Sequence, residues 1–191
     1  MADKLIPTPS QTVGPFFHLG MAHPEWADLA ADDPAGERVA IEGRVTDGDG
    51  APVPDAIIEL WQANAAGRYN HPDDRQEDKP LDPNFRGFGR VATDAEGRFR
   101  VTTIKPGAVP GRGNALQAPH INLAVFARGL LKHLHTRIYF ADEALNTGDK
   151  LLSSIEDAAV RDTLLARRGD AGVYRFDIVL QGDSETAFLD I

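Results

Sequence analysis

Apolar and polar residues alternate along much of the chain after residue 38, and this period of two is typical of half-buried β-strands. Val39, Ile41 and Val45 lie on one face of the first such segment, with Glu42 and Arg44 on the other. Comparable patterns predict further strands over residues 56–62, 88–93, 98–104, 120–128, 134–140 and 173–180, and a last edge strand over 186–191. Several short strands without regular intervening helices predict a mainly β protein built as a two-sheet β-sandwich.

Turns and one helix complete this pattern. The turn-forming residues 47–52 and 94–97, the latter with Gly97 at the tight position, predict two hairpins between successive strands. Loose helical spacing of apolar residues predicts one helix over 155–168. The long polar loop 68–86 has a length that is usually functional or interfacial in compact domains.

The N-terminal segment differs from the rest of the chain. Prolines interrupt residues 1–36 repeatedly, which predicts an extended N-terminal arm with one short helical segment around 25–30. We expect the β-sandwich domain to cover 37–191, so that the chain forms a single domain overall. The arm carries Phe16 and Phe17, and these aromatic side chains need a surface to cover them, either the sandwich or a neighbouring subunit.

Composition narrows the possible partners and the chemistry. The chain has 29 acidic and 20 basic residues, a formal net charge of −9 that repels nucleic acid and anionic lipid. An anionic substrate would therefore need a local arginine or lysine. The absence of cysteine excludes disulfides and thiolate metal sites, and fits the cytoplasm. No run of 18 apolar residues predicts a membrane span.

Four short segments carry the candidate chemistry. They comprise the arm segment 8–17, the strand and loop 61–71, the segment 81–87, and the glycine-containing loop 104–107 that is followed by 118–123. In their order and spacing these segments resemble the intradiol ring-cleavage dioxygenases over nearly the whole chain. The resemblance implies the β-sandwich of that family and a reaction in which dioxygen opens the ring of an aromatic ortho-diol.

Iron-bearing members of this family hold Fe(III) with two tyrosines and two histidines. By that resemblance the corresponding positions here are Tyr69, Val109, His120 and Asn122. The ligand set is chemically sensible, because a hard trivalent ion favours phenolate oxygen and alternate residues of a strand project from one face. Tyr69 and His120 have the residue types of the family's ligands at their positions. Valine has no lone pair and a neutral amide is a poor ligand for ferric iron. The resemblance therefore implies a vestigial metal site, with no metal bound by this chain.

The same resemblance implies a partner. Some members of the family pair an alpha chain without iron with a homologous beta chain that binds the Fe(III). The resulting alpha–beta hetero-oligomer takes O2 and a carboxylated catechol as substrates. In such an assembly Thr12, Gly14, Pro15 and Arg128 would line the substrate pocket of the partner. The threonine hydroxyl and the arginine suit a substrate carboxylate, and the glycine and proline suit a narrow backbone wall.

Simpler roles are open for the same residues. Tyr69 could cover the edge of a sheet, and His120 could be a hydrogen-bonded residue at the start of a strand. Arg128 could be an ordinary strand-end charge in solvent, whereas Thr12 and Pro15 could anchor and stiffen the arm.

Two other functions are also open. Residues 41–58 resemble the opening of prealbumin-like β-sandwich modules, which bind without catalysis. His133 and His135 alternate along one strand, a spacing that offers half of a separate metal site to a metalloenzyme acting alone.

Overall fold

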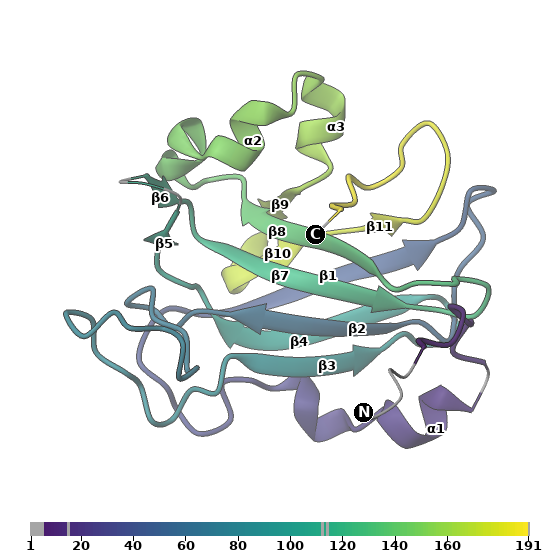
Figure 1. The fold of residues 1–191 in the computed structure, drawn as a ribbon, viewed down its shortest axis with the longest axis horizontal. Helices are drawn as coiled ribbons and strands as arrows, with labels where there is room; N and C mark the ends of the chain where they lie inside the picture. Colours follow the sequence, from purple (N-terminus) through teal and green to yellow (C-terminus); the bar gives the residue numbers. More distant parts are fainter. Residues whose placement is uncertain (1–5, 15, 112, 114, 191) are drawn as a thin grey trace.

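The computed structural model describes residues 6–14, 16–111, 113 and 115–190, and its main feature is a pair of facing β-layers (Figure 1). One layer contains β1 (Arg38–Thr46), β4 (Arg98–Ile104), β10 (Val173–Arg175) and β11 (Ile178–Val179). The other contains β2 (Ile57–Gln62), β3 (Phe88–Ala92), β7 (His120–Phe126) and β8 (Leu134–Phe140). The predicted two-sheet sandwich is confirmed.

One strand joins the two layers. β9 (Leu165–Arg168) pairs in parallel with β8 and antiparallel with β10, so the strands form one continuous hydrogen-bonded path. A separate two-stranded sheet, β5 (Val109–Pro110) with β6 (Leu116–Gln117), lies beside the start of β7. The sequence pattern did not predict this small sheet, because each of its strands is only two residues long.

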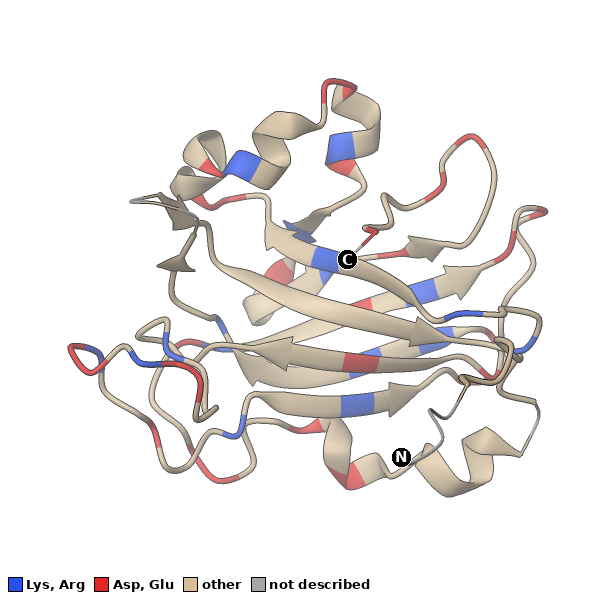
Figure 2. Ribbon diagram, in the orientation of Figure 1, with Lys and Arg blue, Asp and Glu red and all other residues tan. Residues whose placement is uncertain are grey.

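The core fills the space between the layers. Ile41 of β1 and Val101 of β4 belong to the same buried cluster as Ile58 of β2 and Val125 of β7. Each buried aliphatic side chain of this size stabilises the fold by roughly 1.5–3 kcal/mol relative to exposure. Figure 2 shows acidic residues concentrated in the loops and helices, with few along the strands that enclose this core.

Neither predicted hairpin joins two whole strands, although the turn at 47–52 folds the chain back on β1 through a bridge between Thr46 and Pro52. β1 pairs with β4, β10 and β11, whereas β2 pairs with β3 and β7. The turns at 47–52 and 94–97 therefore carry the chain from one layer to the other, although Gly97 adopts the predicted turn conformation with φ 73°. Alternation fixes which face of a strand is buried, but it does not identify the strand beside it.

The predicted helix over 155–168 is confirmed only in part, because a short helix lies within it while its last residues form a strand. The chain forms α2 (Lys150–Ser154) and α3 (Ala158–Asp162), and then turns into β9. The side chains of Asp149 and Asp157 accept N–H groups from the first turns of α2 and α3, which starts each helix separately. Tertiary pairing with β8 and β10 overrides the loose helical spacing of the last residues.

The predicted strand over 173–180 is interrupted. Between β10 and β11, the Phe176 N–H donates to the carbonyl of Glu42, and Asp177 accepts the N–H of Arg44. The strand expected over 186–191 is reduced, within the described residues, to a bridge between Leu189 and His135.

The predicted extended arm contains more structure than expected. It includes α1 (Phe17–Met21) and a 3-10 helix, η1 (Pro24–Ala27), the latter overlapping the first half of the segment predicted as helical, 25–30. Leu29 and Ala30 are buried in the core, and Leu29 donates its N–H to the carbonyl of Thr102. The remaining 3-10 helices are η2 (Ala144–Gly148) and η3 (Asp170–Gly172).

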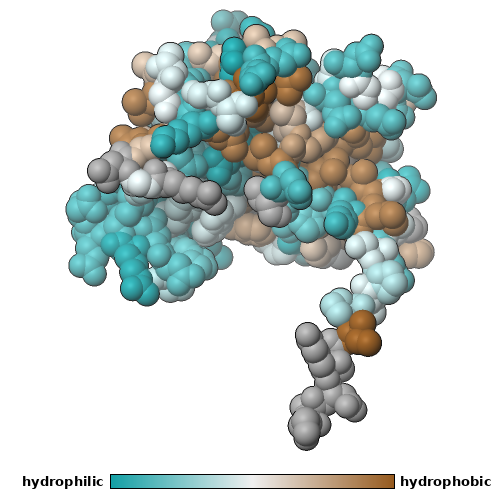
Figure 3. All heavy atoms as spheres, turned by 45° about the horizontal axis from the view of Figure 1, so that its top comes forward, coloured by the Kyte–Doolittle hydropathy of each residue, from teal (hydrophilic) through white to brown (hydrophobic). Residues whose placement is uncertain are grey.

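Residues 6–13, the described beginning of the arm, are exposed. Figure 3 shows this segment standing away from the body of the molecule, and Ile6 is 89% exposed. Within the described part of the chain, no helix has the length and apolar character needed to cross a membrane.

Candidate functional site

The residues singled out in the sequence fall at opposite ends of β7. His120 and Asn122 lie at its start, and Arg128 follows its end. Because β7 is a seven-residue strand, its ends are roughly 20 Å apart. The predicted vestigial metal positions and the predicted partner-facing residues therefore form two separate sites.

The first site is built on the register of β7 and β8. His120 stands opposite Tyr139, and Asn122 stands opposite Arg137. Alternate residues project from the same face, so these four side chains share one side of the sheet. Asn122 also pairs with Trp61 of β2 on its other side.

Tyr69 and Val109 approach this face from outside β7. A cavity of about 370 Å³ is lined by both residues together with Trp61 and Gln117. The Tyr69 ring stacks on Trp61 with 5.7 Å between the ring centroids, and its hydroxyl accepts from Nδ2 of Asn122 at 3.4 Å. The structure thus brings the four predicted vestigial positions into one neighbourhood.

An arginine lies in the middle of this neighbourhood. Arg137 donates from Nε to Oδ1 of Asn122 at 2.9 Å, and from Nη1 to Oε1 of Gln117 at 2.8 Å. The same Nη1 donates to the hydroxyl of Tyr139 at 3.2 Å. Tyr139 in turn donates to the buried carboxylate of Asp149 at 3.3 Å. One positive group therefore connects β6, β7 and β8.

His120 is held as a neutral imidazole. It is only 3% exposed, and its Nδ1 lies 2.7 Å from the carbonyl of Ala118, an acceptor that requires a proton on Nδ1. Burial, together with the nearby charge of Arg137, lowers the pKa of His120 to about 4. The predicted alternative role, a hydrogen-bonded residue at a strand start, matches these contacts.

Tyr69 is held as a neutral phenol. Burial raises the pKa of Tyr69, although the hydrogen bond from Asn122 and the charge of Arg137 oppose the rise. A phenol must lose its proton to become a strong ligand for ferric iron.

The residues at this site do not fit a ferric ion. Val109 offers no donor, and the amide of Asn122 is already engaged with Tyr69 and Arg137. The guanidinium of Arg137 adds a positive charge where a metal cation would need negative ligands. Across the residues that the structure describes, no group of three or more His, Cys, Asp or Glu side chains could hold a metal ion.

The second site joins the arm to the loop after β7. The hydroxyl of Thr12 accepts the backbone N–H of Gly129 at 2.9 Å, which places the arm beside Arg128. The Arg128 side chain is 54% exposed and forms an ion pair with Asp55. Gly14 has φ 70°, a backbone conformation that favours glycine, and it faces open space. Pro15 lies outside the described residues.

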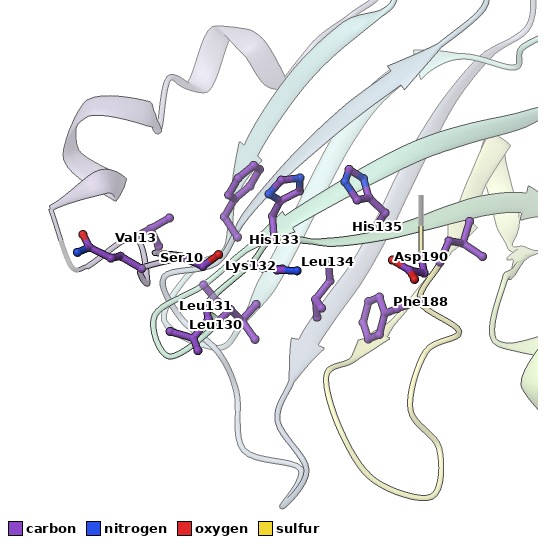
Figure 4. A pocket seen from close by; sticks show the side chains of 14 residues that line it. Ser10, Val13, Leu130, Leu131, Lys132, His133, Leu134, His135, Phe188 and Asp190 are labelled. Carbon is purple, nitrogen blue, oxygen red and sulfur yellow. The ribbon is translucent and has the colours of Figure 1, made fainter. Parts of the chain in front are cut away.

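A groove of about 660 Å³ runs beside this second site (Figure 4). Its lining comes from the arm, from the loop between β7 and β8, and from the C-terminal segment, including Val13, Leu131, His133 and Phe188. The lining residues flank Thr12 and Arg128 but do not include them.

His133 and His135 lie on this groove, and Figure 4 shows their rings side by side. The ring centroids are 4.5 Å apart at a steep angle, and His133 also stacks on Phe126. Burial lowers the pKa of His135, as does the neighbouring His133. Since no third metal-binding side chain joins them among the described residues, the separate metal site expected for a lone metalloenzyme gains no support.

Sequence reasoning missed Arg137, Tyr139 and Asp149. The signal for Arg137 is its cross-strand position opposite Asn122, which depends on the β7–β8 register. The length of the loop between these strands does not determine that register, so the sequence alone did not reveal the contact.

Comparisons with known proteins agree on one family. A family model described as "Dioxygenase" matches residues 13–182. The chain is 42% identical to the protocatechuate 3,4-dioxygenase alpha chain of Pseudomonas putida, over 100% of both chains. It is 46% identical to the protocatechuate 3,4-dioxygenase beta chain of Burkholderia cepacia, over 81% of this chain and 68% of that one.

Solved structures agree with this result. The dioxygenase domain of a dioxygenase–carbohydrate-binding fusion from Streptomyces sp. SirexAA-E matches with TM-score 0.62 and 28% identity, covering 95% of this chain and 100% of that one. The 3-chlorocatechol 1,2-dioxygenase of Rhodococcus opacus 1CP shares the fold with TM-score 0.64 at 23% identity, covering 91% of this chain and 69% of that one.

Proposed function

The chain belongs to the intradiol dioxygenase family, and from that premise we propose that it is the alpha subunit of a protocatechuate 3,4-dioxygenase. In this proposal a homologous beta subunit binds the catalytic Fe(III), and the two chains form a hetero-oligomer in the cytoplasm. The enzyme cleaves protocatechuate (3,4-dihydroxybenzoate) with O2 to 3-carboxy-cis,cis-muconate. When bound in the partner, the ferric ion supplies the site where the ortho-diol is activated toward dioxygen.

One observation carries the assignment to the alpha chain. Percentage identity does not decide it, because the chain is similar to alpha and beta chains alike. Val109 and Asn122 leave the metal position without two of its donors, and Arg137 adds a positive charge through its hydrogen bonds to Asn122 and Tyr139. A chain with this site needs another subunit for metal chemistry.

The contribution of this chain is to shape and charge the substrate pocket of the partner. Thr12, Gly14, Pro15 and Arg128 are the proposed lining residues. The hydrogen bond between Thr12 and Gly129 supports this role, because it fixes the arm next to an exposed arginine. In a chain of net charge −9, Arg128 provides the local positive charge that a substrate carboxylate needs.

The alternative of a stand-alone prealbumin-like module rested on the resemblance of residues 41–58 alone, a segment that forms most of β1 and the start of β2. The family match extends from the arm through β11, which such a module would not explain.

Metal content tests the proposal directly. We expect the full chain, purified alone after growth in iron-rich medium, to be colourless and free of stoichiometric iron. Co-expressed with an iron-binding beta chain, it should form a complex with one iron per heterodimer and the visible absorption of ferric phenolate. Tightly held, stoichiometric iron in the isolated chain would overturn the assignment.

A further inference from the structure

The vestigial metal position holds a positive charge that belongs to the protein. Arg137 extends from β8 across the sheet face and donates to Asn122, which stands at one of the four positions aligned with metal ligands. Asn122 in turn donates to Tyr69, which stands at a second. The side-chain amide of Asn122 thus links the guanidinium of Arg137 to the hydroxyl of Tyr69.

The surroundings of Arg137 consist of oxygen acceptors from three separate elements. They are Oδ1 of Asn122 on β7, Oε1 of Gln117 on β6 and the hydroxyl of Tyr139 on β8 itself. Asn122 also donates to the carbonyl of Trp61 on β2 at 3.2 Å. These contacts tie together strands that meet at this end of the sandwich, a task that a bound metal performs in many proteins.

Arg137 lies beside the former ligand positions, because it donates to Asn122 and to the hydroxyl of Tyr139, the residue that stands opposite His120. A trivalent cation beside these residues would be repelled by the guanidinium at short range, in surroundings where charges are poorly screened. Missing donors and an added positive charge therefore act in the same direction.

We propose that Arg137 is a built-in cation that replaces the metal, bracing the strands around the old site and actively excluding metal ions from it. This inference deepens the proposed function, because it takes the chain to be the subunit without iron. It implies that restoring the lost donors is not enough to restore metal binding, and that the charge of residue 137 must also be removed.

A set of full-chain variants separates charge from donors. Val109→Tyr with Asn122→His restores the phenol and imidazole, and Arg137→Gln or Arg137→Lys is then added to that pair. The glutamine keeps a hydrogen-bond donor for Gln117 without the charge, whereas the lysine keeps the charge. The readouts are bound iron per chain after incubation with ferric iron and dialysis, and the visible ferric-phenolate absorption.

We expect iron only in the variant with glutamine, with at least about a tenfold rise in bound metal over the double variant, since a nearby unit charge strongly weakens binding of a trivalent ion. The lysine variant should remain at the level of the double variant. If the double variant with Arg137 intact binds iron as well as the glutamine variant does, the exclusion role is wrong. If the glutamine variant folds but binds no more iron, the proposal also fails.

A milder pair guards against variants that do not fold. The two variants are Asn122→His alone and Asn122→His with Arg137→Gln, and both change only partly exposed residues. Each offers Zn²⁺ the imidazoles of residues 120 and 122 and the phenol of Tyr69. The proposal requires tighter Zn²⁺ binding, measured by calorimetry, when Arg137→Gln is present. Equal affinity with and without Arg137 would overturn it.

The outcomes remain distinct from those of the proposed function. Iron in the unmodified chain contradicts the assignment as the subunit without iron. Iron in the double variant that retains Arg137 contradicts only the role given to this arginine.

Discussion

Asn122 lies between Tyr69 and Arg137, and its amide donates to the first while its oxygen accepts from the second. A histidine at this position could not serve both neighbours in the same way, because a neutral imidazole has one donor and one acceptor in a fixed ring geometry. At the scale of single residues, the pocket is therefore adapted to an arginine. The neutral states of Tyr69 and His120 are consistent with this arrangement.

His120 should make stability depend on pH in a defined window. Its pKa is about 4 in the folded chain because of burial, against the ordinary value of 6.5. Between these values the unfolded chain binds more protons, so the free energy of unfolding falls as the pH drops. The loss attributable to His120 is about 3 kcal/mol, complete near pH 4.

Urea unfolding of the parent chain and of His120→Asn, measured from pH 7 to pH 4, checks this expectation. The variant lacks the titrating imidazole, so the difference in stability between the two proteins should shrink on acidification. Parallel pH profiles for both proteins would contradict the role of His120. Carboxylates with lowered pKa, such as Asp142, lose their stabilising contribution at still lower pH and affect both proteins alike.

Arg128 should act on substrate rather than on metal. In the complex with the beta chain, Arg128→Ala is expected to raise KM for a carboxylated catechol by roughly tenfold or more, because a charge-assisted hydrogen bond is lost. Steady-state kinetics and iron analysis of the same preparation measure the two effects. Arg175→Ala, at an exposed position of β10, is the matched control and should leave KM unchanged.

The choice of substrate sharpens this test. A catechol without a carboxylate should lose much less activity in Arg128→Ala than the carboxylated one does. Equal losses with both substrates, or loss of iron with unchanged KM, would show that Arg128 does not recognise the carboxylate.

At the scale of elements, β1 is the strand that organises one layer. It pairs with β4 from Arg38 to Arg44 and with β10 and β11 on its other side, where the chain between the latter two crosses Gly43. A Cβ atom on Gly43 would overlap the carbonyl oxygen of Phe176 and would also press on the ring of Phe99. Glycine is required here by the close approach of another backbone.

Gly43→Ala should therefore destabilise the sandwich by about 3 kcal/mol, since the overlap involves backbone that cannot move aside cheaply. Chemical unfolding measures the change. Gly148→Ala is the control, because its added Cβ meets no atom within 4 Å, and it should change stability by less than about 0.5 kcal/mol. Similar stability for both variants would contradict the close approach at β1.

At the scale of the whole molecule, the arm is suited to contact with another chain. Ile6 and Phe16 expose most of their side-chain surface, and the arm is held to the loop after β7 through Thr12. Apolar side chains displayed in this way on an extended segment are typical of surfaces that a partner covers. The groove beside Thr12 and Arg128 continues the same surface.

Removal of residues 1–11 should leave the free chain as stable as before, because the core begins only at Leu29. It should weaken association with the beta chain, seen as a loss of the hetero-oligomer in native mass measurements at low micromolar concentration. Thr12→Val provides a conservative comparison, because it removes only the hydrogen bond between the Thr12 hydroxyl and the backbone N–H of Gly129. Unchanged assembly of the truncated chain would show that the arm does not serve the interface.

Local patterns carried a large part of this description. Alternation located most of the strands and the β-sandwich, because burial of one face of a strand is written into every second residue. Turn-forming residue types located the turn at Gly97. The resemblance to iron-bearing intradiol dioxygenases implied an incomplete metal site at residues 69, 109, 120 and 122, because ligand chemistry depends on side-chain identity. Only the tertiary structure decided which strands are neighbours, where the helix after Asp149 breaks, and that Arg137 stands opposite Asn122. Pairing and register arise from contacts between residues far apart in sequence, which no local period records.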